Sequence, residues 1–332
     1  MGNNKRLYLC YHGDLKLIDN CILIESENDI KKYSVDGINE ILILGEVRID
    51  RKFLEIISEL GIIIHFFNYY GYYSGSFYPN KHNNVSDLVL KQVQCYLDNN
   101  KRLEIAKLIV GGAVHNILQV IKYYKYRGKD LSKIESNIEI LQQQINNCTS
   151  INELMAIEGN VRNYYYKAFD TIIENQDFVF EERSKRPPKN YINTLISFGN
   201  SMLYTTILSQ IYYTNLDPRI GYLHTSNYRR YTLNLDIAEI FKPIIVDRTI
   251  FNVVNKAIIT ADDFEFFSEG IILKDKGRKD FVYHFENKLD SYIAIGETGE
   301  IVSYRELIRK ELHNLENYIF YGKSYKPFAA RW

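Results

Sequence analysis

The chain has 332 residues and a formal net charge of zero, because 41 Lys and Arg residues balance 41 Asp and Glu residues. Hydrophobic residues make up 46% and charged residues 25%, which are ordinary values for a globular protein. These values exclude long disorder, collagen and a coiled-coil rod. They also exclude a uniformly basic nucleic-acid coat, while leaving room for a local basic patch. A chain this long buries enough surface to fold without disulfides or a structural metal.

No segment has the pattern of a membrane span or a signal peptide. The longest apolar stretches, near Leu60–Phe67 and Phe241–Val246, are far shorter than the ~20 residues that cross a bilayer. The four cysteines form no C-x-x-C pair, which argues against a zinc site and fits a reducing compartment. They are Cys10, Cys21, Cys95 and Cys148. We therefore expect a cytoplasmic protein that is not embedded in a membrane.

The first eighty-odd residues predict a small β-rich domain with one helix. Short β-favouring runs are separated by the turn signals Gly13-Asp14 and Asp19-Asn20. The expected strands are Leu7–Leu9, Leu15–Ile18, Cys21–Glu25, Lys31–Val35, Glu40–Leu44 and Gly61–Phe67. Between the last two, Asp50 can cap a helix over Arg51–Leu60. Ser74-Gly75 predicts a further hairpin turn.

The pattern becomes helical after a polar, turn-rich run at 78–84, which is the best linker candidate in the chain. Ser86 can cap a first helix with its apolar face at Val89, Leu90, Val93 and Leu97. A capping box at Ser150 opens a later helix, and helical patterns continue to the C-terminus. We therefore expect an α+β protein, with a β-rich domain at 1–84 and a larger all-α domain at 85–332.

One carboxylate lies on the apolar side of a predicted helix. Leu154, Val161 and Tyr165 form a stripe at i, i+7 and i+11, and Glu158 fills the i+4 position. A buried carboxylate must be paired, bound to a metal or protonated, because burying it alone costs several kcal/mol. Arg162, one turn later, is an available partner. On spacing alone, a local ion pair is the simpler interpretation.

A second acidic feature precedes a proline. Asp236 and Glu239 are three residues apart and share one helix face, where two like charges are unfavourable unless a cation is near. Pro243 crowds the carbonyl of residue i−4, which is Glu239, so we expect a kink or break there. The simpler alternative is that Asp236 caps the helix and Glu239 follows in its first turn.

His224 ends the sequence Gly221-Tyr222-Leu223-His224, twelve residues before Asp236. A lone histidine is more often structural than a ligand. Two carboxylates and one imidazole would nevertheless suit Mg²⁺ or Mn²⁺. The chain has no H-E-x-x-H, no phosphate-binding G-x-x-x-x-G-K-[ST] and no G-x-G-x-x-G. These absences exclude common alternatives better than the spacing establishes a metal site.

Five segments in family order, together with a similar C-terminal ending, carry a family resemblance over nearly the whole chain. They are Gly45-Glu46-Val47 with Leu60-Gly61-Ile62 and Gly75; Ala106-Lys107-Leu108-Ile109-Val110; Glu158-Gly159 with Tyr164 and Phe169; Arg186-Pro187-Pro188 with Asn193, Leu195, Ser197-Phe198-Gly199 and Tyr204; Gly221-Tyr222-Leu223-His224 with Leu235-Asp236, Glu239, Phe241-Lys242-Pro243 and Val246-Asp247-Arg248; and Tyr325, Pro327-Phe328 and Arg331-Trp332. In these segments the sequence resembles the CRISPR-associated spacer integrases, the endonuclease family of CRISPR adaptation (CRISPR-associated protein one).

The resemblance implies both a fold and a site. The family has a β-sandwich-like N-terminal domain, commonly used for homodimerisation, and a helical catalytic domain. It implies that Glu158, His224 and Glu239 are the catalytic residues and bind Mg²⁺ or Mn²⁺. The departures are Asn227 and Lys242, where the family often has arginine. They put phosphate contacts at Asn227 in doubt, but not the metal triad.

Further residues are candidates to support this site or to contact DNA. Asp236 could be a supporting or alternative ligand, and the ammonium of Lys242 could reach a phosphate oxygen. Tyr164 and Tyr204 match family positions and could orient the site, although ordinary core packing explains them equally well. The remaining candidates for phosphate contacts are Arg162, Arg186, Arg229, Arg230 and Arg248.

The implied function is the antiviral CRISPR adaptation step that joins the 3′-hydroxyl ends of foreign DNA into the CRISPR array, with endonuclease activity. The implied partners are double-stranded DNA, a second copy of the chain and a small ferredoxin-like protein (CRISPR-associated protein two). Two alternatives use the same residues differently. One is a metal-dependent repair nuclease, and the other is a non-catalytic protein that binds branched DNA.

Overall fold

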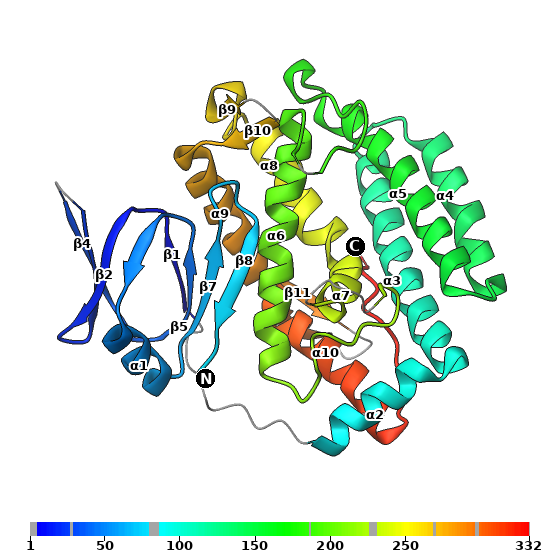
Figure 1. Cartoon of the computed structure of the whole chain (residues 1–332). Helices are drawn as coiled ribbons and strands as arrows, with labels where there is room; N and C mark the ends of the chain where they lie inside the picture. The colour runs from blue at the N-terminus through cyan, green and yellow to red at the C-terminus, as the bar shows by residue number, and fades with distance from the viewer. Residues whose placement is uncertain are drawn as a thin grey trace. The chain divides into compact units, whose positions relative to one another are not determined.

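The computed structural model describes residues 5–26, 29–79, 86–185, 187–225, 231–267, 270–295 and 299–331. Its contacts divide the chain into two compact units, Met1–Asn83 and Asn84–Trp332. The first is rich in strands and the second is mainly helical (Figure 1). The predicted fold class, a β-rich domain followed by a larger helical one, is confirmed.

Two four-stranded sheets and one helix form the N-terminal unit. The sheet orders are β1-β5-β7-β8 and β4-β3-β2-β6, and each contains both parallel and antiparallel pairs. The elements are β1 (Lys5–Leu9), β2 (Gly13–Ile18), β3 (Cys21–Glu25), β4 (Ile30–Ser34), β5 (Ile38–Ile43), β6 (Val47–Ile49), α1 (Arg51–Leu60), β7 (Ile63–Phe67) and β8 (Tyr73–Phe77). As predicted, Asp50 caps α1 by accepting from the Phe53 N–H.

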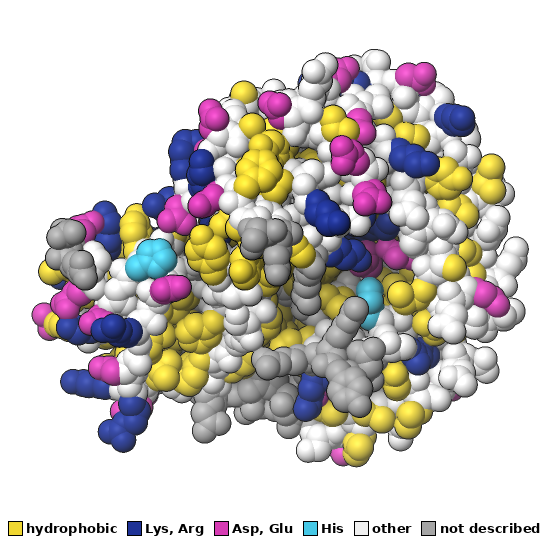
Figure 2. Space-filling model, turned by 45° about the horizontal axis from the view of Figure 1, so that its top comes forward, with side chains coloured by type: hydrophobic (Ala, Val, Ile, Leu, Met, Phe, Trp, Pro, Cys, Tyr) yellow, Lys and Arg dark blue, Asp and Glu magenta, His cyan; other side chains and the backbone are white. Residues whose placement is uncertain are grey.

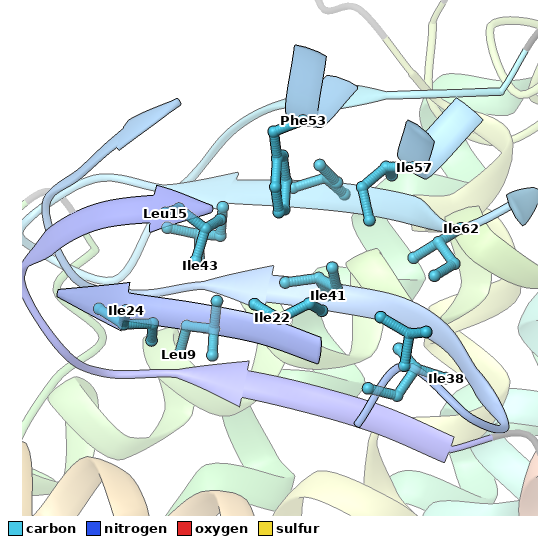
Figure 3. Close-up of a cluster of buried hydrophobic side chains, with 12 residues drawn as sticks. Leu9, Leu15, Ile22, Ile24, Ile38, Ile41, Ile43, Phe53, Ile57 and Ile62 are labelled. Carbon is cyan, nitrogen blue, oxygen red and sulfur yellow. The ribbon is translucent and has the colours of Figure 1, made fainter. Parts of the chain in front are cut away.

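The core of this unit lies between the two sheets and α1. Leu15 and Ile22 from one sheet meet Ile41 and Ile43 from the other, and Phe53 covers them from α1 (Figure 3). This face-to-face packing agrees with the sandwich-like architecture. The predicted turn at Ser74-Gly75 is wrong, because Gly75 pairs with Phe66 inside β8. Asn68 and Gly71 make the turn instead, and Gly71 stands four residues before Gly75.

Buried His65 in β7 makes the stability of this unit sensitive to acid. Burial, helped by the charge of Arg6, lowers the pKa of His65 to about 3. Between pH 6.5 and 3, His65 is protonated in the unfolded chain but stays neutral in the folded chain. The free energy of unfolding therefore falls as pH falls through this window. We expect a loss of about 2 kcal/mol at pH 5 relative to neutral pH.

The measurement is urea unfolding of the full chain between pH 7.5 and 5. His65→Gln should flatten the pH dependence, whereas His284→Gln, at a partly exposed position on the other unit, should leave it as in wild type. An equally steep loss of stability in His65→Gln would contradict this prediction.

Nine helices make up most of the C-terminal unit in its described residues. They are α2 (Ser86–Leu97), α3 (Asn99–Tyr126), α4 (Ser132–Gln144), α5 (Ile151–Ile173), α6 (Tyr191–Tyr212), α7 (Leu233–Phe241), α8 (Arg248–Asn255), α9 (Asp275–Asp290) and α10 (Tyr304–Tyr321). Shorter helical turns are η1 (Ile145–Asn147), η2 (Gln176–Phe178), η3 (Pro243–Asp247) and η4 (Ala261–Asp263). Two hairpins that the sequence patterns did not predict are β9 (Phe264–Phe267) with β10 (Gly270–Leu273), and β11 (Tyr292–Ile295) with β12 (Glu300–Ser303).

Helix α3 is the central helix of this unit and packs against α2, α4, α5 and α7 (Figure 1). By length and composition it is also the one helix among the described residues that could cross a membrane, a candidate that the uninterrupted apolar stretches of the sequence did not predict. Of the apolar stretch that meets this test, 61% is buried inside the protein. Core helices of soluble proteins also pass a test of length and hydropathy. Its length therefore reflects its place at the centre of the helical unit.

The predicted apolar face of α2 is wrong at its two leucines, while Val89 and Val93 are half-buried. Leu90 and Leu97 are exposed, whereas Gln92 and Cys95 are buried. The leucines follow a helical period, but the buried side of the helix includes Gln92, which is hydrogen-bonded to a distant loop. The start of α5, by contrast, is as predicted, because the Ser150 side chain accepts from the Glu153 N–H.

Candidate active site

The three residues of the predicted triad come from three segments of the helical unit. Helix α5 carries Glu158, α7 carries Glu239, and the loop before α7 carries His224. The charges of Glu239 and His224 act on the pKa of Glu158, and the charge of Glu239 acts on the pKa of His224. Figure 2 shows acidic and basic side chains and a histidine gathered on one face of this unit.

Arg162 links the two glutamates. Its Nη2 donates to Glu239 Oε2 at 2.7 Å, and its Nε lies 3.4 Å from Glu158 Oε1. The local Glu158–Arg162 pair expected from spacing is therefore present, but the shorter and more buried bond goes to the carboxylate on α7. Because Arg162 is almost fully buried, its charge is held where it stabilises negative charge at this site.

Lys242 neutralises Glu239 from the other side. Its Nζ is 2.5 Å from Glu239 Oε1 and lies 5.1 Å from the centre of the Tyr204 ring. Burial alone would raise the pKa of Glu239, but Lys242 and Arg162 outweigh it and hold that pKa far below its ordinary value. Burial opposes the charge of Lys242 as well, and the Glu239 carboxylate outweighs it and raises the pKa of Lys242.

The predicted break at Pro243 occurs. Helix α7 ends at Phe241, and the π-helical turn η3 begins at Pro243. Proline has no N–H to donate to the carbonyl four residues earlier, which belongs to Glu239. Arg162 Nη2 lies 3.4 Å from that carbonyl oxygen and supplies a donor in its place. The same arginine thus binds both the backbone and the side chain of Glu239.

Asp236 orders the loop that ends in His224. Its Oδ2 accepts from the backbone N–H groups of Tyr222 at 2.5 Å and Leu223 at 2.9 Å. Its Oδ1 accepts from the backbone N–H of His224 at 3.0 Å and lies 2.7 Å from the Nδ1 of that ring. A Cβ at Gly221 would lie 2.8 Å from Asp236 Oδ2, so the approach needs glycine there.

Two consequences follow for His224. A hydrogen bond from Nδ1–H to Asp236 leaves the lone pair on Nε2, the atom then able to bind a metal. Burial by itself would lower the pKa of His224, but the hydrogen bond and charge of Asp236 outweigh it and raise that pKa. Asp236 is therefore a positioning residue, and the helix-capping position that the sequence left open for it belongs to Thr232.

Gln92, which the sequence patterns missed, holds the same loop at its beginning. Its Nε2 donates to the carbonyls of Asp217 at 3.0 Å and Ile220 at 2.9 Å, and its Oε1 accepts from the Asp217 N–H at 2.8 Å. A glutamine on a predicted amphipathic helix has the pattern of a solvated residue. Only its burial, which depends on a loop 125 residues later, reveals the role.

Asp247 is a second missed residue. It is buried, and its Oδ2 lies 3.9 Å from Arg162 Nη1. Burial raises the pKa of Asp247 to about 7, against the opposing charge of Arg162. The sequence Val246-Asp247-Arg248 was part of the family resemblance, which is the signal that could have singled it out. Arg162 therefore contacts three carboxylates.

The residue types of the triad fit a divalent metal ion. Burial, together with the negative charge of Glu239, raises the pKa of Glu158. A dication between the two glutamates would relieve that repulsion. The side chains do not converge as they stand: among the described residues, no three His, Cys, Asp or Glu side chains are placed to hold a metal. The oxygens of Glu239 contact Lys242 and Arg162 instead.

The remaining candidates to orient the site or to contact DNA have fewer contacts with the triad. Tyr204 lies beside Lys242, whereas the ring of Tyr164 is contacted by the ammonium of Lys167. Arg248 stacks over Tyr123 at 4.7 Å. Arg186, Asn227, Arg229 and Arg230 lie outside the described residues.

Comparison with known proteins decides the family. The family model of CRISPR associated protein Cas1 matches residues 7–287. The chain belongs to the Cas1 family. A CRISPR-associated endonuclease Cas1 of Thermodesulfovibrio yellowstonii is 52% identical over 328 residues, which cover 99% of each protein. The resemblance found in the sequence is thereby confirmed.

Solved structures agree with the Cas1 fold. A Cas1 protein from Thermotoga maritima is 42% identical, covers 99% of this chain and 100% of its own, and superposes with a TM-score of 0.84. A casposase bound to integration product has a TM-score of 0.87 at 21% identity, covering 98% of this chain and 93% of its own. At that identity the likeness shows the fold alone.

Proposed function

We propose that this Cas1-family chain is the integrase and endonuclease of CRISPR adaptation. It would join the 3′-hydroxyl ends of foreign DNA fragments into a CRISPR array. The observation that carries the proposal is that Arg162 joins Glu158 to Glu239 and Lys242 binds Glu239, in a family whose relatives are called endonucleases. The charge of Glu239 also acts on the pKa of His224. The casposase that shares this fold is bound to an integration product, which is the kind of product we propose here.

The proposed metal ligands are Glu158, His224 through Nε2, and Glu239. A bound Mg²⁺ or Mn²⁺ would supply the Lewis acid for phosphoryl transfer. Asp236 holds the His224 ring in the required tautomer. Lys242 and Arg162 hold the Glu239 carboxylate, and both are cations that DNA phosphate would attract.

The proposed reaction needs no protein nucleophile. The 3′-hydroxyl of the incoming fragment attacks a phosphorus of the array, a new phosphodiester forms, and the old bond to the neighbouring 3′-oxygen breaks. One phosphodiester replaces another, so ATP is not required. With water in place of the 3′-hydroxyl, the same site would act as an endonuclease.

The proposed partners are double-stranded DNA, a second copy of the chain and the small ferredoxin-like adaptation protein. Dimerisation is assigned to the N-terminal unit on the family resemblance. The neutral chain favours local rather than uniform attraction of DNA. The cytoplasm is the proposed location, and the four free cysteines fit a reducing compartment.

The test is the joining of labelled DNA with free 3′-hydroxyls to a supercoiled plasmid that carries a leader and a repeat. We expect covalent joining with Mn²⁺ or Mg²⁺, and a loss of more than ~100-fold in EDTA and in Glu158→Ala, His224→Ala and Glu239→Ala. Glu139→Ala, on the surface of α4, is the matched carboxylate control and should join as wild type does.

Each other outcome points elsewhere. Cleavage without joining, even with the small adaptation protein added, would favour the repair nuclease. DNA binding without metal-dependent chemistry would favour the non-catalytic binding protein. Joining that survives all three alanine changes would show that the ligands are assigned wrongly.

A further inference from the structure

The last residues of the chain return to the central helix of the catalytic unit. Segment 325–330, called the C-terminal strap here, follows α10 and lies against α3. The ring of Tyr325 and the side chain of Ala330 at its two ends are buried. Part of this strap belongs to the family resemblance, but the proposed chemistry gives it no role.

One buried side chain connects the strap to α7. Asn116 of α3 donates through Nδ2 to the Ile240 carbonyl at 2.9 Å and to the Phe328 carbonyl at 3.1 Å. Its Oδ1 accepts from the Ala330 N–H at 2.8 Å. Ile240 is the residue next to Glu239, so a single amide holds both the strap and the end of the helix that carries the proposed ligand.

A ring contact makes the same connection. The rings of Phe241 and Phe328 are nearly parallel, with 4° between their planes and 6.1 Å between their centres. Phe241 is the last residue of α7 and is fully buried. The strap therefore contacts α7 directly after Glu239, through packing as well as through Asn116.

The strap is itself fixed from the side away from α7. Glu311 of α10 accepts from Tyr325 Oη at 2.5 Å and from the Phe328 N–H at 2.9 Å. A Cβ at Gly112 would lie 2.8 Å from the Cβ of Pro327, so the strap approaches α3 where only glycine leaves room. These contacts make it a rigid support.

The end of α7 needs such a support. Pro243 interrupts the regular helix there, and the next backbone bond, from Asp247 N–H to the Lys242 carbonyl, spans five residues instead of four. Two carbonyls before the break, those of Glu239 and Ile240, accept from side chains of other elements. Arg162 holds the Glu239 carbonyl, and Asn116 holds that of Ile240.

We propose that the C-terminal strap, acting through Asn116 and Phe328, positions the backbone of α7 so that Glu239 can bind the metal ion. The inference rests on the proposed function, in which Glu239 is a ligand. Asn116 and Phe328 are positioning residues, since they reach the site through α7.

The experiment measures Mn²⁺ binding by electron paramagnetic resonance in the full chain without DNA. Asn116→Leu removes the amide at similar size, and we expect it to weaken Mn²⁺ binding about tenfold. Phe328→Leu keeps the strap's backbone bonds and removes the ring, and it should weaken binding in the same direction but less. His115→Gln is the control, because His115 Nε2 contacts the Ala330 carbonyl but neither of the α7 residues.

A second readout needs no metal. Hydrogen exchange of the amides in 238–247 should be faster in Asn116→Leu and Phe328→Leu than in wild type, and unchanged in His115→Gln. Thermal unfolding checks that each variant is folded. If Asn116→Leu does not fold, Phe328→Leu decides.

The two proposals fail differently. If wild type binds no Mn²⁺, or Glu239→Ala binds it equally well, the metal assignment is wrong, and hydrogen exchange alone decides whether the strap holds α7. If Glu239→Ala loses Mn²⁺ while folded Asn116→Leu and Phe328→Leu match wild type in binding and exchange, the strap inference is overturned.

Discussion

Glu239→Gln should destabilise the metal-free protein by about 3 kcal/mol, in addition to abolishing catalysis. The carboxylate of Glu239 is buried between Arg162 and Lys242. Removing its charge leaves two buried cations without their closest counter-charge. Breaking a buried pair in this way is costly because the remaining charge stays desolvated.

Glu158→Gln should have the opposite effect on stability. The pKa of Glu158 is raised by burial and by the charge of Glu239. Its folded pKa therefore lies above the unfolded one, and its ionisation near neutral pH opposes folding. We expect Glu158→Gln to be neutral or slightly stabilising, although it also removes a proposed ligand.

Urea unfolding of both variants in EDTA at pH 7.5 measures the contrast. We expect both variants to lose activity, while the free energy of unfolding falls in Glu239→Gln and does not fall in Glu158→Gln. This contrast would reflect the different surroundings of the two carboxylates. Equal destabilisation by both substitutions would contradict the assigned roles of Arg162 and Lys242. Glu139→Gln on the surface of α4 is the control and should change stability by less than about 0.5 kcal/mol.

Asp236→Asn is the second change with a large expected effect. Each oxygen of Asp236 accepts from two N–H groups. In asparagine one oxygen becomes an NH₂ group that would face donors, so two buried donors lose their acceptor. We expect a loss of about 3 kcal/mol in stability and of more than ~100-fold in DNA joining, because the His224 loop is no longer held.

His224→Ala distinguishes the role of the imidazole ring from that of the loop backbone. It should abolish joining while costing less than about 1 kcal/mol, because His224 is partly exposed and its backbone bond to Asp236 remains. Asp275→Asn, at the exposed start of α9, controls for the loss of an aspartate. Wild-type stability in Asp236→Asn would show that the loop does not depend on this carboxylate.

The sequence was informative where local rules dominate. Strand runs, the cap at Asp50 and the break at Pro243 follow from a few neighbouring residues, and the structure confirms them. The turn at Ser74-Gly75 failed because glycine also fits inside a strand. The predicted apolar face of α2 was wrong at Leu90 and Leu97, because exposed leucines can follow the same period as a buried face.

The site was predictable only in part, for a related reason. Spacing placed Glu158 and Arg162 one turn apart, and the family resemblance supplied the triad. Neither could reveal Gln92 or Asn116, whose bonds join residues more than 100 positions apart. A buried amide and a solvated one look alike in a sequence, and only the fold distinguishes them.

The ion pairs at Glu239 bear on whether the protein needs a metal ion in order to fold. Lys242 and Arg162 already balance the charge of this carboxylate, so folding does not have to wait for a supply of ions, unlike a zinc finger. A divalent ion that takes both Glu239 oxygens has to replace these resident cations, and its arrival is an exchange of partners. The proposed metal ion would therefore bind a site that is already folded, and the metal-free protein would keep its structure.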